Sequence, residues 1–130
     1  MQYVTRIFTL FCVALFLSGC ATLADSVSSK GTGQFRIYEK DFDTVWSAVL
    51  DVIKVSKLQL VSENKGDGEI LAQRGLSALS YGENVAIFVE KQGSEVKTRV
   101  EVVSKKALAT NVFATNWEKK ILEELDSKLK

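Results

Sequence analysis

The most regular hydrophobic pattern in the chain begins beside Asp41. Apolar residues then recur at steps of three and four as far as about Ser56, which is the spacing of one stripe on an α-helix. The residues of this stripe are Phe42, Val45, Trp46, Val49, Leu50 and Ile53. Asp41 suits the N-cap position, and Asp43 lies in the first turn, where the helix dipole favours a negative charge. The sequence therefore predicts an amphipathic helix over residues 41–56.

Five shorter segments are typical of β-strands. A first strand is predicted over residues 35–39, and two hairpins are predicted further on. The hairpin strands are residues 58–64 with 69–74, and residues 85–91 with 96–104. The turns contain Asp67-Gly68 and Gly93, which favour tight connections. In the last strand apolar and charged residues alternate, which indicates a sheet with one buried and one wetter face.

A second amphipathic helix is predicted at the C-terminal end. Trp117, Ile121, Leu125 and Leu129 follow one another at four-residue steps. Residues 115–118 fit a capping box, although the helix could instead begin near residue 110, where Phe113 extends the stripe. The predicted order is β-α-β-β-β-β-α. This order favours an α+β fold with two layers, in which two helices cover an antiparallel sheet of four or five strands. Trp46 and Trp117 are expected in its core.

The first twenty residues have a different pattern. A positive charge at Arg6 precedes an apolar run over residues 7–17, and small residues then lead to Cys20. This run is shorter than the ~20 residues that span a bilayer, so it is typical of a cleaved secretory signal. Leu17-Ser18-Gly19-Cys20 resembles the lipobox of bacterial lipoproteins. The resemblance implies cleavage before Cys20, a diacylglyceryl group on its sulfur and acylation of its new amine.

Small and polar residues dominate the segment after Cys20, so residues 21–34 are predicted to form a flexible tether. The expected organisation is a signal peptide over residues 1–19, the lipidated cysteine with its tether over 20–34, and one α+β domain over 35–130. Ala21 occupies the position at which inner-membrane lipoproteins of the enterobacterial type carry Asp. By that resemblance the protein is expected in the outer membrane, facing the periplasm, rather than in the inner membrane.

The predicted element order is similar to the TATA-binding-protein-like and helix-grip folds. It is also similar to the small domains of the C-type lipoprotein of the outer-membrane barrel-assembly machine. Two segments, Asp41-Phe42-Asp43-Thr44-Val45-Trp46 and Gly68-Glu69-Ile70-Leu71-Ala72, resemble a broad set of uncharacterised periplasmic lipoproteins. Such fold-level resemblance does not specify a function.

Charge and composition exclude several functions. Without Arg6, the sixteen remaining basic residues equal the sixteen acidic ones, so no net charge attracts the mature chain to nucleic acid. The chain has no histidine, and Cys12 would leave with the signal, so the domain lacks the usual ligands of zinc, haem and iron–sulfur clusters. A Ser–Lys pair, Ser104 with Lys105 or Lys106, is supported only by adjacency. We expect no cofactor and no catalysis.

Two stretches are candidate contacts for a protein partner. The link over residues 75–84 carries Leu76, Leu79 and Tyr81, which either form a binding loop or cap the edge of the core. Strand alternation would place four further side chains on the sheet face away from the helices: Tyr38, Phe88, Lys97 and Arg99. A mixture of aromatic and Arg side chains suits a protein contact, although scattered exposed aromatic residues are also ordinary.

The sequence therefore favours a lipid-anchored binding or scaffold module with a periplasmic or outer-membrane protein as its partner. The alternative is a carrier or sensor of a small apolar ligand that would bind between helix and sheet.

Overall fold

A computed structural model describes residues 1, 21–76, 82–93, 96–107 and 114–130. Five strands form one antiparallel sheet in the order β1-β5-β4-β3-β2. The strands are β1 (Gln34–Tyr38), β2 (Gln59–Asn64), β3 (Glu69–Arg74), β4 (Glu83–Lys91) and β5 (Thr98–Lys106). The helices are α2 (Leu23–Ser28), α3 (Phe42–Val55) and α4 (Trp117–Leu129). The predicted α+β class and antiparallel sheet are confirmed, whereas the prediction of two helices is wrong because α2 is a third.

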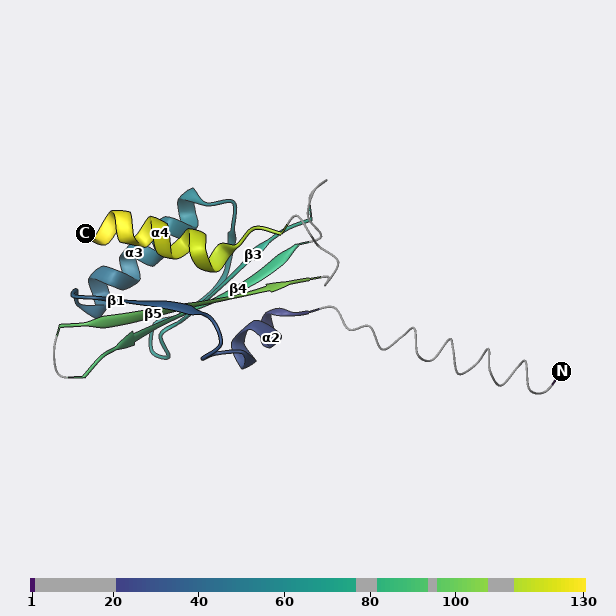
Figure 1. Cartoon of the computed structure of the whole chain (residues 1–130), viewed down its shortest axis with the longest axis horizontal. Coiled ribbons are helices and arrows are strands. Elements are labelled where there is room, and N and C mark those ends of the chain that lie inside the picture. Colours follow the sequence, from purple (N-terminus) through teal and green to yellow (C-terminus); the bar gives the residue numbers. More distant parts are fainter. Residues whose placement is uncertain (2–20, 77–81, 94–95, 108–113) are drawn as a thin grey trace.

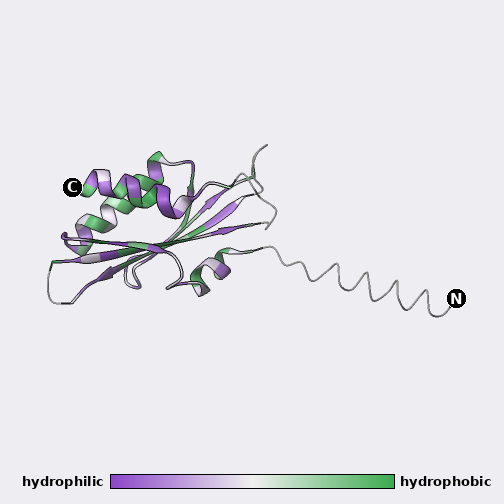
Figure 2. Ribbon diagram, in the orientation of Figure 1, coloured by the Kyte–Doolittle hydropathy of each residue, from purple (hydrophilic) through white to green (hydrophobic). Residues whose placement is uncertain are grey.

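Helices α3 and α4 cover one face of the sheet, and α2 lies against the other face (Figure 1). The start of α3 agrees with the sequence prediction, since the Asp41 side chain accepts a hydrogen bond from the Thr44 backbone N–H at 2.9 Å. Helix α3 carries more hydrophobic residues than α4 (Figure 2). Trp46 from α3 and Trp117 from α4 are both buried in the main core, as predicted.

Helix α4 begins at Trp117, but not with the predicted capping box. Asn116 is the N-cap, and its side-chain oxygen accepts from the Lys119 backbone N–H at 3.0 Å. The carboxylate of Glu118 instead accepts from the backbone N–H of Ser104 on β5, at 3.1 Å. A tertiary contact has therefore replaced the local bond that the sequence pattern suggested.

The register of the sheet divides its residues between two faces. The face toward α3 and α4 carries the apolar core residues Ile70, Ala72, Val85, Ile87, Val89, Val100 and Val102. Tyr38 also belongs to this face, which contradicts its predicted place on the other one. Its hydroxyl donates to Asp126 of α4 at 3.0 Å. Burial of the phenol is the main cause that raises its pKa, and this hydrogen bond raises the pKa further. The polar end of Tyr38 can thus lie at the core's edge without losing a partner.

The second face of the sheet is partly covered by α2, which overturns the prediction of a flexible tether at residues 23–28. Val27 of α2 packs with Leu71 against a small apolar cluster of Ala86, Phe88 and Val103. The hydroxyl of Ser26, fully buried, donates to the backbone oxygen of Asn84 at 3.3 Å. Packing against the sheet supplies the stability that so short a helix lacks by itself.

Candidate partner-contact surfaces

The described segment that begins at Ala21 is bound to the sheet at its first residue. The backbone N–H of Ala21 donates to the oxygen of Ala107 at 3.2 Å. The backbone oxygen of Ala21 accepts from the side-chain amide of Asn84 at 2.9 Å. The amide oxygen of Asn84 accepts from Gln73 at 2.8 Å, which fixes the orientation of that group. Both polar groups of the Ala21 backbone are therefore used to hold it against the ends of β4 and β5.

A capping box continues this attachment into α2. The Thr22 side chain accepts from the Asp25 backbone N–H, while the Asp25 carboxylate accepts from the Thr22 backbone N–H. The backbone and side-chain bonds from Thr22 lower the pKa of Asp25. The cap satisfies donors that the first turn of a helix leaves without a partner.

The segment that follows α2 is held by the carboxylate of Glu101, a buried residue of β5. One of its oxygens accepts from the backbone N–H groups of Gly31 and Gly33, at 2.6 and 3.1 Å. The other accepts from Arg99 at 2.9 Å. Burial acts to raise the pKa of Glu101, but the bonds from Arg99, Gly33 and Gly31 together outweigh it, so the pKa lies below its ordinary value.

Gly33 permits the close approach of this segment to the sheet. A Cβ added there would overlap the backbone oxygen of Val102 on the neighbouring strand. Glycine is therefore required at this position because there is no room for a Cβ. The backbone conformation does not require it, since the φ of Gly33 is not positive.

The predicted site residues fall in different places. Phe88 lies on the expected sheet face, but it is only 3% exposed because the residues of α2 and its surroundings cover it, so the predicted contact at Phe88 is wrong. Leu76 is 79% exposed and lies beyond the end of β3. Leu79 and Tyr81 lie outside the described residues, and so does Cys20. Of the three candidates that the structure describes, Leu76 lies beyond one end of the sheet, whereas Arg99 pairs with Glu90 toward the other end, so these two are not brought together.

Arg99 lies on the sheet face that Phe88 shares, nearer the edge strand β1. Its guanidinium carbon is 4.5 Å from the centre of the Phe35 ring. Ile37 is the register partner of Arg99, and the side chains of Phe35 and Ile37 are 49% and 51% exposed. We call Phe35, Ile37 and Arg99 the β1 patch.

The sequence identified Arg99 of the β1 patch but not Phe35 or Ile37, because alternation alone does not say which side of an edge strand faces the core. Arg36 and Tyr38 take the inner side and both interact with Asp126 of α4. The choice of face depends on the pairing of β1 with β5 and on the position of α4. No local signal in residues 34–38 contains that information.

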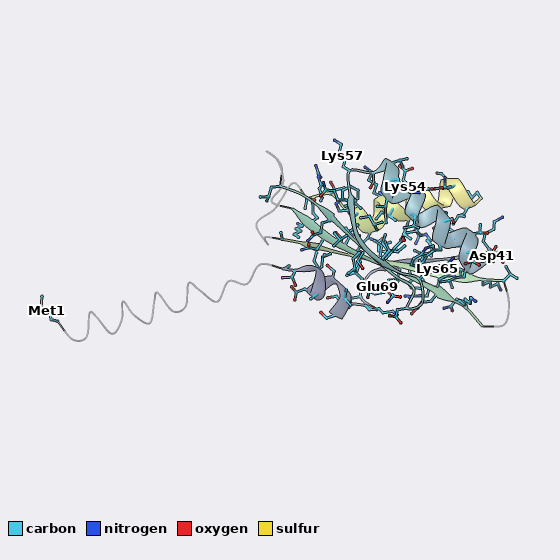
Figure 3. The ribbon with its side chains drawn as sticks, turned by 180° about the vertical axis from the view of Figure 1, so that it is seen from behind. Met1, Asp41, Lys54, Lys57, Lys65 and Glu69 are labelled. Carbon is cyan, nitrogen blue, oxygen red and sulfur yellow. The ribbon has the colours of Figure 1, made fainter. Side chains whose placement is uncertain are left out.

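A groove of about 340 Å³ lies between α3 and the opposite edge strand, β2. Its lining is formed by Leu50, Ile53, Lys54, Leu58, Leu60 and Glu63. Lys54 is one of two lysines labelled near the C-terminal end of α3 in Figure 3, whereas Asp41 and Lys65 lie near its other end. A larger hollow at that other end is crossed by an ion pair between Lys65 and Asp43, with a nitrogen–oxygen distance of 2.7 Å.

The described residues contain no group of three or more His, Cys, Asp and Glu side chains that could hold a metal ion. Among the described helices, none combines the length and the hydropathy needed to cross a membrane. No protein-family model matches the sequence, and no curated protein matches it. The function of the chain must therefore be inferred from its own residues and geometry.

Proposed function

We propose that this chain is a lipid-anchored, non-catalytic module that binds a protein partner through the β1 patch. The observation that carries the proposal is that two half-exposed apolar side chains of the edge strand β1 lie beside an arginine of the neighbouring strand β5. An edge strand can accept an extended segment of another protein, and aromatic residues with Arg are enriched where proteins bind one another.

The anchor in this proposal is Cys20, and its support is the lipobox resemblance of residues 17–20. Ala21 at the next position favours the outer membrane, with the domain in the periplasm and a periplasmic or outer-membrane protein as partner. Replacement of Cys20 by Ser removes the lipidation point. The variant should leave the membrane fraction or remain an uncleaved precursor, as fractionation and the mass of the product would show. A mature-sized Cys20→Ser protein in the membrane would contradict the anchor.

The contact surface is tested by crosslinking the full-length protein in intact cells and recovering what is attached to it. Ile37→Asp places a charge in the centre of the β1 patch and should abolish a specific crosslinked product. Val61→Asp is the matched control, because Val61 is also apolar, 50% exposed and on an edge strand, but on the opposite edge. Equal loss of the product in both variants, or in neither, would contradict a contact at β1.

The groove beside β2 supports a second candidate, a carrier of a small apolar ligand. Its volume of about 340 Å³ and its four apolar lining residues resemble the dimensions and lining of small-molecule sites. Leu60→Trp would occupy the groove from the exposed strand β2. The carrier hypothesis predicts that the wild-type protein, and not this variant, retains an apolar fluorescent probe such as a naphthalene sulfonate.

A further inference from the structure

The position of Ala21 bears on how the domain stands on the membrane. If the lipid is attached to Cys20, only that residue separates the acyl chains from a backbone already bound to the sheet. Consecutive Cα atoms are about 3.8 Å apart, so this connection is far shorter than the roughly 20 Å expected of a flexible coil over residues 21–34. We infer that the end of the sheet at Ala21 lies directly against the lipid surface, in one orientation. This inference rests on the proposed lipidation of Cys20.

Several independent contacts keep Ala21 in this place. The backbone bonds to Ala107 and Asn84 hold the residue itself. The capping box of α2 begins at the next residue, and Val27 and Ser26 of that helix pack on the sheet. Release of the segment would also expose the apolar cluster beneath α2. The segment from Ala21 through α2 is therefore part of the folded domain, beginning at the first residue after the proposed anchor.

The sheet register shows which surface faces the lipid. Glu83 at the start of β4 is the register partner of Arg74 at the end of β3 and of Lys106 at the end of β5, so these three strand ends lie at one end of the sheet. Ala107 follows β5 at this end and binds Ala21, and α2 begins there (Figure 1). Leu76, two residues beyond β3 and 79% exposed, lies on the same side. An exposed leucine beside a lipid anchor suits the apolar boundary of a bilayer.

The opposite end of the sheet points away from the membrane. It contains the turn between β2 and β3 and the connection between β4 and β5. Val96 lies in that connection and is 67% exposed, so it resembles Leu76 in character and accessibility. The nine residues of β4 separate the two ends by about 30 Å at about 3.3 Å per strand residue. The two side chains therefore report on opposite ends of the same domain.

A single labelled cysteine distinguishes these ends. The lipidated chain would have no free thiol, because Cys20 is modified and Cys12 leaves with the signal, so Leu76→Cys and Val96→Cys each label at one site. The full-length proteins are produced in cells, purified with their lipid and placed in vesicles of phosphatidylethanolamine and phosphatidylglycerol. Bimane is attached to the cysteine, and nitroxide-labelled lipid headgroups act as quenchers. The label at residue 76 should lose most of its fluorescence, and the label at residue 96 should keep it.

An insertion provides the control for the short connection. Ten Gly and Ser residues between Cys20 and Ala21 leave every described contact intact but allow the domain to move away from the lipid. The insertion should restore the fluorescence of the label at residue 76. Equal quenching at both sites in a lipid-bearing protein, or no effect of the insertion, would overturn the fixed orientation while leaving the anchor in place. A purified protein whose mass shows no lipid would overturn the anchor, and the orientation with it.

Discussion

Phe88 provides a direct test of the layer formed by α2. The side chain was expected on an open sheet face, but it is 3% exposed and packs in the cluster that Val27 covers. Truncation of a buried Phe to Ala costs roughly 3–5 kcal/mol of stability. The covering helix has only six residues and can shift to fill part of the cavity, which favours the lower end of this range. Lys30 lies 5.0 Å from the ring centre, and loss of this cation–π contact adds ~0.5–1 kcal/mol.

We therefore expect Phe88→Ala to lower the free energy of unfolding by about 3–4 kcal/mol. The measurement is urea unfolding of residues 20–130 carrying Cys20→Ser, followed by the fluorescence of Trp46 and Trp117, which are both buried. Phe35→Ala is the matched control, because Phe35 lies on the same sheet face but is 49% exposed. Its cost should stay below about 1 kcal/mol.

The comparison of Phe88→Ala with Phe35→Ala tests whether α2 covers Phe88. A loss below about 1 kcal/mol for Phe88→Ala, or equal losses for both variants, would show that α2 does not cover Phe88 in solution. The face that bears Phe88 would then be available to a partner, as the sequence alone suggested.

Three further predictions concern other parts of the fold. Trp46→Ala should lower the free energy of unfolding by ~3–5 kcal/mol because the ring is buried. Val55→Ala, on the exposed side of the same helix, should change it by less than ~0.5 kcal/mol. Comparable losses for the two variants in urea unfolding would contradict the orientation of α3. Gly33→Ala should lower the stability by ~1–3 kcal/mol because the added Cβ overlaps backbone atoms of Val102. Gly75→Ala should be neutral or slightly stabilising, because a Cβ added there has no atom within 4 Å. A thermal melt in which Gly75→Ala is the less stable variant would refute this packing. Because the pKa of Glu101 is lowered in the folded state, its ionised carboxylate stabilises the fold above the ordinary pKa of 4.5, and this stabilisation is lost as the pH falls through the folded-state pKa. Glu101→Gln should therefore make the free energy of unfolding less dependent on pH on the acid side. An unchanged pH dependence, measured by urea unfolding at a series of pH values, would disprove that role.

Local patterns in the sequence determined the elements whose signals are complete within a few residues. Helix α3 follows the three- and four-residue spacing of its apolar stripe, and Asp41 caps it as expected. The first hairpin turns at Gly68, which has a positive φ of 67° that glycine adopts without strain. The alternation of Thr98, Val100 and Val102 with charged residues correctly placed these three side chains on one buried face of β5, although Glu101 and Val103 on its other face are buried as well.

Contacts between distant residues decided the candidate surfaces. Which side of β1 faces α4 depends on the pairing of β1 with β5, about sixty residues later, and on the position of α4 beyond it. Arg99 consequently lies beside Phe35, while Tyr38 is directed into the core. Alternation divides the residues of a strand into two sets, but only the neighbouring layers determine which set is buried.

The segment after Cys20 shows most clearly what local sequence determines and what tertiary contacts determine. Thr22 and Asp25 have the spacing of a capping box, yet the segment has too few apolar residues to form a stable helix by itself. Asn84 and Glu101, both on the sheet, hold its two ends. Local sequence thus permitted α2, whereas tertiary packing stabilised it, because a six-residue helix cannot offset its conformational entropy without a surface to bury against.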